Sequence, residues 1–140
     1  MRRKIDRPHT SADRIAGDAL MASYSKYHAR PCTIDGKRFA SQLEARRYQQ
    51  LKLLQQAGEI SELVTQPVFV LQEKTVDAWT GKTIPRQTYV GDFMYRETAT
   101  GKIICSDVKG VETQTFRLKW NLVRPRYPDI EFRVLTKKDF

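Results

Sequence analysis

The clearest pattern along the chain is that of an amphipathic helix within residues 39–60. Apolar side chains recur there at helical spacing, and Tyr48 and Leu51 fall on one stripe that is expected to face a sheet. Ser41 has the short polar side chain preferred at a helix N-cap, and Gly58 stands where a helix commonly ends. The pattern therefore predicts a helix that starts near Ser41 and stops near Gly58.

Four stretches rich in β-branched and aromatic residues predict strands, because residues typical of turns separate them. These strands cover residues 63–74, 88–97, 101–110 and 130–135. A turn around Thr100-Gly101 joins the second to the third, so these two are expected to form an antiparallel hairpin. A short hairpin with Asp35-Gly36 at its tip precedes the helix, and residues 77–87 are expected to form a loop or hairpin tip.

A second helix is predicted over residues 113–128. Phe116, Trp120 and Val123 recur there at helical spacing. Pro125 is expected to end this helix, because proline lacks the backbone N–H that a helix interior needs. The resulting order, α-β-β-β-α-β, predicts an α/β (α+β) fold class with a central mixed sheet of about four strands flanked by helices.

Charged residues interrupt the strand predicted over residues 101–110. Both of its faces are mostly apolar, so the strand is expected to be central in the sheet, yet it ends in Asp107 and Lys109 on one face. The antiparallel hairpin can bring Asp92 of the preceding strand opposite Asp107. Two carboxylates that close repel each other unless a cation neutralises them, and Mg²⁺ is the natural cation for oxygen ligands.

Glu44 is a candidate third acid. It lies on or beside the helix stripe expected to face the sheet, four residues before Tyr48. The alternative is structural, because Ser41 and Glu44 have the spacing of a capping box, in which Glu44 bonds the Ser41 backbone N–H. With Asp92 and Asp107 expected nearby, we favour the role as a ligand.

The charge balance indicates a polyanionic partner. The 140 residues include 25 basic and 16 acidic ones, a net charge of +9, which favours nucleic acid over an anionic membrane or mere solubility. The length suits one domain with a real core. We expect a basic N-terminal arm over residues 1–25 and a compact domain over residues 26–140.

Several other classes of protein lack support in the sequence. Cys32 and Cys105 stand far apart, so a cysteine zinc site or a structural disulfide is not expected. No GxxxxGK[ST] loop indicates a nucleotide cofactor, and no apolar run has the length of a membrane span. The N-terminus has no secretory pattern, so a cytoplasmic location in a bacterial host cell is expected.

Motifs spread over the chain carry a family resemblance. They are Asp35-Gly36, Phe39, Ser41, Glu44-Ala45, Tyr48, Leu51, Ala57 to Ile60, Gln66-Pro67, Tyr89, Asp92-Phe93, Tyr95, Asp107 to Gly110, Phe116, Lys119 and Tyr127 to Phe132. Asp92 followed by Asp107-Val108-Lys109 in this element order resembles the PD-(D/E)XK nuclease superfamily. The run from Lys26 to Leu135 is similar, more narrowly, to a family of small phage proteins of unknown function. Gly91 departs from the superfamily pattern, which has proline before this aspartate.

The resemblance implies a restriction-endonuclease-like core and Mg²⁺-dependent phosphodiester hydrolysis, with Mn²⁺ as a substitute. Asp92, Asp107 and the Val108 carbonyl would be metal ligands. Glu44 would hold a second metal or a metal-bound water. Lys109 would orient the attacking water and offset charge on the phosphate.

The implied function is a phage or prophage endonuclease that cuts DNA. Lys119, with Arg117 and Arg124 on the same predicted helix, is a candidate phosphate contact, although a solvated helix lysine is an equal alternative. The small size favours structure-selective cutting of junctions, flaps or replication intermediates, for which a homodimer would suit. The alternative function is a catalytically inactive nucleic-acid-binding accessory module on the same fold.

Overall fold

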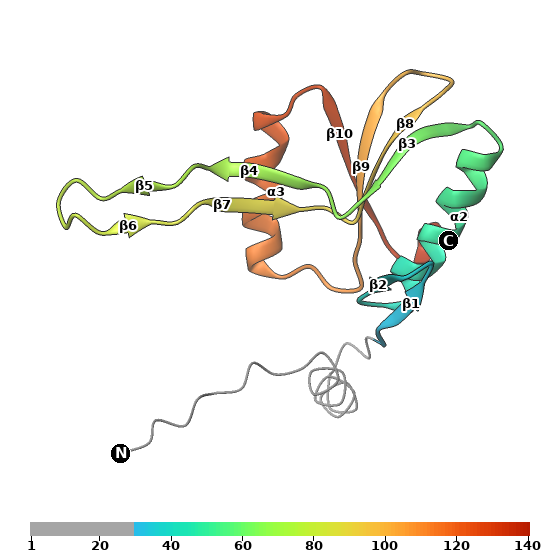
Figure 1. The fold of residues 1–140 in the computed structure, drawn as a ribbon, viewed down its shortest axis with the longest axis horizontal. Helices are drawn as coiled ribbons and strands as arrows, with labels where there is room; N and C mark the ends of the chain where they lie inside the picture. The colour runs from blue at the N-terminus through green and yellow to red at the C-terminus, as the bar shows by residue number, and fades with distance from the viewer. Residues whose placement is uncertain (1–29) are drawn as a thin grey trace, which may run out of the picture. The chain divides into compact units, whose positions relative to one another are not determined.

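The computed structural model describes residues 30–140, and the arm predicted over residues 1–25 lies outside them (Figure 1). Contacts within the chain divide it into two compact units, Met1–Gln42 and Leu43–Phe140. We describe each unit by itself. The described part of the first unit is a hairpin of β1 (Cys32–Ile34) and β2 (Lys37–Phe39).

The tip of this hairpin is the predicted Asp35-Gly36 turn. Both residues have positive φ, 53° for Asp35 and 73° for Gly36, which is the conformation that a two-residue hairpin turn needs. The prediction of a hairpin at this position is confirmed.

The second unit contains the predicted central sheet. Its helices are α2 (Gln42–Gln56), α3 (Gln114–Arg126) and the short 3₁₀ helix η1 (Lys137–Asp139). Its strands are β3 (Ile60–Thr65), β4 (Val68–Gln72), β5 (Thr75–Val76), β6 (Thr83–Ile84), β7 (Gln87–Val90), β8 (Phe93–Glu97), β9 (Ile103–Val108) and β10 (Ile130–Leu135). The predicted α-β-β-β-α-β order is confirmed by α2, β3, β8, β9, α3 and β10.

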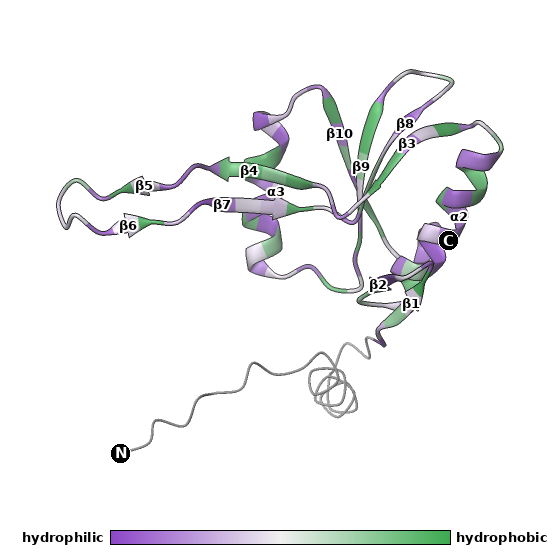
Figure 2. Ribbon diagram, viewed as in Figure 1, coloured by the Kyte–Doolittle hydropathy of each residue, from purple (hydrophilic) through white to green (hydrophobic). Residues whose placement is uncertain are grey.

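The four-stranded sheet has the order β10-β9-β8-β3, and β9 is therefore an interior strand, as its apolar faces predicted. β9 pairs antiparallel with β8 and parallel with β10, so the sheet is mixed. Residues Ile104 to Val108 are all buried. Figure 2 shows a hydrophobic stretch along β9 that matches this burial.

The two faces of the sheet have different partners. On one face, Tyr48 of α2 stacks on Phe93 of β8, with ring centroids 6.4 Å apart. On the other face, Cys105 of β9 joins Val123 of α3 in one buried cluster, which also includes aromatic residues of β4 and β7. Residues alternate between faces along a strand, so Asp107 is on the Cys105 face, the face that α3 covers.

The strands predicted over residues 63–74 and 88–97 are each broken in two, which corrects the prediction of continuous strands. Gln66, whose φ is 52°, and Pro67 separate β3 from β4, while Gly91 and Asp92 separate β7 from β8. The pair β3 and β8 stays in the sheet, whereas β4 and β7 pair with each other in a hairpin that extends away from it (Figure 1). The predicted hairpin tip within residues 77–87 connects β5 to β6 at the end of this extension.

The second helix was predicted to end at Pro125, but α3 includes this proline and continues to Arg126. Proline removes a single donor in this last turn, and Tyr127 still donates its backbone N–H to the Val123 carbonyl at 3.1 Å. The helix begins at a Thr113 N-cap, whose side chain accepts from the Phe116 N–H.

Gly91 allows the close approach of two strand segments. A Cβ at this position would lie 2.6 Å from the Cys105 Sγ and 3.3 Å from the Pro67 Cγ. We predict that Gly91→Ala lowers the free energy of unfolding by about 1–3 kcal/mol, the usual effect of overpacking a close-packed site. Urea unfolding measures this, with Gly110→Ala as control because a Cβ there meets no atom within 4 Å. Equal stability of the two variants would contradict the steric argument.

Candidate functional site

The antiparallel pairing of β8 and β9 brings the segments that carry the two predicted aspartates together. Phe93, which follows Asp92, pairs with Ser106, which precedes Asp107. The backbone N–H of Asp92 donates to the Ser106 carbonyl at 3.2 Å, one residue out of the register of β8 and β9, so the ladder becomes irregular at Asp92. Asp92 thus lies beside the end of β9 that carries Asp107, and the meeting of the two carboxylates at one cation stays a prediction.

Asp107 is a buried carboxylate whose one close partner among the described residues is Lys109. Its relative exposure is 1%, and no backbone N–H donates to either of its side-chain oxygens. The Lys109 Nζ is 3.2 Å from Oδ1. Burial raises the pKa of Asp107, and the positive charge of Lys109 and its contact with the carboxylate oppose the shift. An ionised carboxylate in this setting is incompletely compensated.

Asp92 has one strong hydrogen bond. Its Oδ2 accepts from the backbone N–H of Val108 at 2.6 Å, which ties the carboxylate to the last residue of β9. Burial raises the pKa of Asp92, while the Val108 amide and the Lys109 charge act to lower it. Burial together with the charge of Asp92 raises the pKa of the Cys105 thiol to about 12, so this cysteine is a neutral core residue.

Lys109 is placed by the backbone and by an aromatic ring. Its N–H donates to the Leu135 carbonyl at 2.8 Å, and its Nζ lies 4.6 Å from the ring centroid of Phe116 on α3. The Lys109 side chain is 28% exposed, so its ammonium lies between the buried Asp107 carboxylate and the solvent. Sequence reasoning did not predict this contact between Lys109 and the Phe116 ring.

The structure does not bring Glu44 into a three-acid group with Asp92 and Asp107. Among residues 30–140, no three His, Cys, Asp or Glu side chains are grouped so that they could hold a metal ion. The helix that carries Glu44 packs through Tyr48 on Phe93 of β8. The role of Glu44 as a third ligand stays a prediction.

The three cations predicted to contact nucleic acid lie on α3. Arg117 pairs with Glu112, with Nε and Oε2 3.8 Å apart, and Arg124 donates to Asn121 Oδ1 at 2.6 Å. Lys119 is partly buried and has no ion pair or hydrogen bond with another described side chain. Lys119 is thus the cation of the three without a local partner in this part of the chain.

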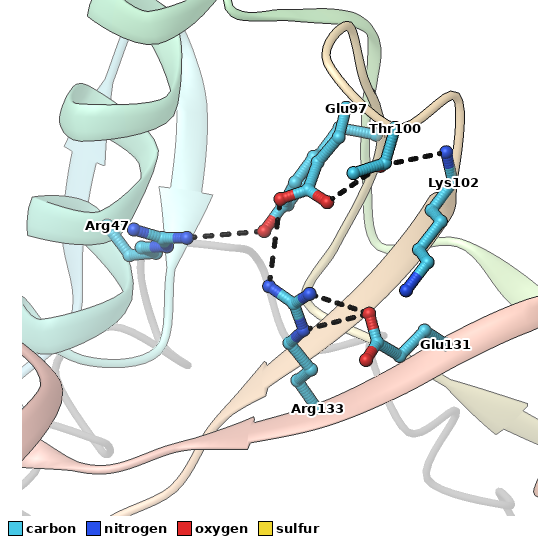
Figure 3. A network of polar contacts seen from close by, with 7 residues as sticks. Arg47, Glu97, Thr100, Lys102, Glu131 and Arg133 are labelled. Carbon is cyan, nitrogen blue, oxygen red and sulfur yellow. Dashed lines mark hydrogen bonds and ion pairs between the residues drawn. The ribbon is translucent and has the colours of Figure 1, made fainter.

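A polar network that the sequence did not predict lies at the opposite end of β8 from Asp92 (Figure 3). Arg133 is 2.6 Å from Glu131 and 3.9 Å from Glu97, and Arg47 donates to the Tyr95 hydroxyl at 3.3 Å. Arg47, Tyr95, Glu97 and Arg133 are among the residues that line a pocket of about 550 Å³. Two carboxylates neutralise Arg133, so we assign the network a structural role that ties α2, β8 and β10 together.

Comparison with known families identifies the chain. A family described as "Protein of unknown function (DUF1064)" matches residues 24–139. The chain belongs to this DUF1064 family. A comparison with curated proteins gives no match. Within the described residues of this DUF1064 chain, no helix is both long and apolar enough to cross a membrane.

The donor set of the DUF1064 site suits a divalent cation. No backbone N–H donates to either Asp107 oxygen, and Asp92 uses one oxygen for the Val108 amide. Carboxylate oxygens are the ligands that hard cations such as Mg²⁺ prefer, and Mg²⁺ is commonly held by only one or two of them. Asp92 and Asp107 therefore offer oxygen donors of the type that such an ion prefers.

The raised pKa values predict how stability depends on pH without divalent cations. Each carboxyl binds its proton more tightly in the folded than in the unfolded protein, so its favourable contribution is complete below the ordinary pKa of 3.8 and is lost as pH rises through the folded pKa. Unfolding in EDTA should therefore show falling stability across this window. Asp107→Asn should flatten the fall, whereas the exposed Asp129→Asn should preserve it. Identical pH profiles for the wild type and Asp107→Asn would contradict this assignment.

Proposed function

We propose that this DUF1064 chain is a Mg²⁺-dependent nuclease of the PD-(D/E)XK superfamily that hydrolyses phosphodiester bonds in DNA. The observation that carries the proposal is the Asp107 carboxylate, which is buried without backbone donors at the end of β9 next to Asp92, with the Lys109 ammonium 3.2 Å away. The net charge of +9 supports a polyanionic substrate.

Each residue has a separate task in this proposal. Asp92 and Asp107 hold the cation, and the Val108 amide fixes the orientation of Asp92. Bound Mg²⁺ would neutralise charge on the phosphate and lower the pKa of water. In hydrolysis a water oxygen bonds to phosphorus, the bond to one ester oxygen breaks, and that oxygen takes up a proton.

Lys109 has the position of a catalytic cation. The Phe116 ring and the Asp107 carboxylate restrict its ammonium from two sides, so little reorganisation is needed when negative charge develops on a phosphate nearby. A fixed cation of this kind stabilises the transition state more than the ground state. Lys119 lies on α3, the helix that follows β9, and has no ion pair or hydrogen bond with another side chain among residues 30–140. Its ammonium is therefore available to contact a phosphate of the DNA backbone.

We predict that Asp107→Asn abolishes cleavage of DNA in Mg²⁺ while binding is kept or strengthened, because the change removes a negative charge near phosphate. Gel cleavage assays and affinity measurements in EDTA test both parts. Asp129→Asn is the matched control and should cut like the wild type. Asp107→Asn that still cuts would contradict the assignment of Asp107 as a ligand.

Two further arms of that experiment separate the alternatives. Mg²⁺ should raise the melting temperature of the wild type but not of Asp107→Asn, since a ligand that binds only the folded state stabilises it. Glu44→Gln should cut at close to the wild-type rate if two carboxylates suffice, and should be inactive if Glu44 is a ligand as the sequence suggested. Wild-type protein that binds DNA and never cuts it would favour the accessory binding module.

Lys109 and Lys119 should affect different properties, the cleavage rate and the affinity for DNA. We predict that Lys109→Ala lowers the single-turnover cleavage rate by ~10²-fold or more with little change in affinity, the scale for losing one preorganised electrostatic group. Lys119→Ala should instead weaken binding and reduce its salt dependence by about one unit of slope. Single-turnover rates and salt-titrated affinities decide between them. Wild-type cleavage by Lys109→Ala would leave Lys109 as a phosphate contact only.

A further inference from the structure

The hairpin that extends from the sheet ends in a fully exposed tryptophan. Trp79 is 97% exposed, at the turn between β5 and β6, whereas the other tryptophan, Trp120, packs against the aromatic core. An indole with this exposure buries almost none of the apolar area through which aromatic side chains stabilise a fold. The stability of the protein therefore does not explain a tryptophan at this position.

The turn that carries Trp79 is nevertheless well ordered by hydrogen bonds. The Asp77 carboxylate accepts from the backbone N–H groups of Trp79 at 2.8 Å and Thr80 at 3.2 Å. The Asp77 N–H donates to the Lys82 carbonyl, and Gly81, with φ 69°, donates to the Asp77 carbonyl, both at 2.8 Å. The backbone at the tip is thus closed on itself and fixes the direction in which the indole leaves it.

The surroundings of Trp79 favour a negatively charged, planar ligand. The hairpin has exposed cations at Lys74, Lys82 and Arg86, against two acids, Glu73 and Asp77. The Asp77 carboxylate already serves the turn, and Glu73 lies 3.9 Å from Arg86. Nucleic acid offers both partners that this tip lacks, a base face for the indole and phosphates for the cations.

The hairpin also connects the tip to the acidic site. β7 ends at Val90, and Gly91 and Asp92 follow before β8 begins at Phe93. The β4–β7 extension (Figure 1) therefore begins next to the candidate metal ligand in the sequence. The chain from Thr80 to Val90, at about 3.3 Å per residue, spans roughly 30 Å. This length corresponds to roughly nine base pairs at 3.4 Å each. One DNA molecule can therefore reach both Asp92 and Trp79.

We propose that Trp79 stacks on an unpaired or unstacked base, so that the protein prefers DNA with a fork, flap or junction to continuous duplex. This inference rests on the proposed nuclease function. A two-stranded ribbon is narrow enough to enter a groove, and apolar wedges insert where stacking is already broken, because unstacking intact duplex costs a few kcal/mol per step.

The test compares a continuous duplex with a splayed fork of the same sequence, both bound in EDTA. We predict that Trp79→Ala weakens fork binding about tenfold or more and duplex binding about twofold or less, since stacking on one base gives about 5- to 150-fold in affinity. Val76→Ala is the matched control, because Val76 is also exposed on this hairpin and has no ring. Trp79→Phe should restore much of the preference for the fork.

Indole emission gives an independent readout. Fork DNA should quench the wild type more than duplex does, and Trp79→Phe, which keeps Trp120, should lose this extra quenching. If Trp79→Ala and Val76→Ala bind both DNAs as the wild type does, the stacking role is refuted while cleavage by the wild type upholds the nuclease. If the wild type neither binds nor cuts either DNA, the nuclease proposal itself fails.

Discussion

Two backbone hydrogen bonds hold the corner on which the site depends. Gly91 donates to the Pro67 carbonyl and Gln66 donates to the Asp92 carbonyl, both at 2.9 Å. They join the two chain segments at the point where the β3–β8 pair of the sheet ends and the β4–β7 hairpin begins. The corner holds Asp92 beside β9, and it also begins the hairpin that ends at Trp79. A close approach of this kind requires glycine at position 91.

The sequence predicts the central part of this arrangement for a simple reason. Alternation along β9 and an antiparallel partner are local properties, and together they bring the segment of Asp92 beside the end of β9 that carries Asp107. The corner was not predicted because its cause is non-local. Pro67 and Gly91 are far apart in sequence, and each stretch alone has the composition of one continuous strand. The positive φ of Gln66 has no side-chain signal.

Glu44 illustrates a second limit of sequence reasoning. Helical spacing correctly predicts that the stripe with Tyr48 faces the sheet, and Tyr48 is buried against Phe93. Spacing does not tell which face of the sheet a helix covers, because that depends on how the chain connects helix and strand. A helix predicted correctly from its spacing therefore leaves the role of Glu44 as a third ligand a prediction.

The buried acids also explain why this end of β9 differs from the rest of the core. Elsewhere the interior of the second unit is mainly aromatic and aliphatic. At Asp107 a carboxylate is desolvated without backbone hydrogen-bond donors, an arrangement that lowers stability unless a cation or a proton compensates it. Lys109 gives partial compensation, since its ammonium is shared between this carboxylate and the Phe116 ring. In the proposed site a divalent ion would supply the remaining positive charge, so the same feature that lowers the stability of the metal-free fold would favour the binding of a cation.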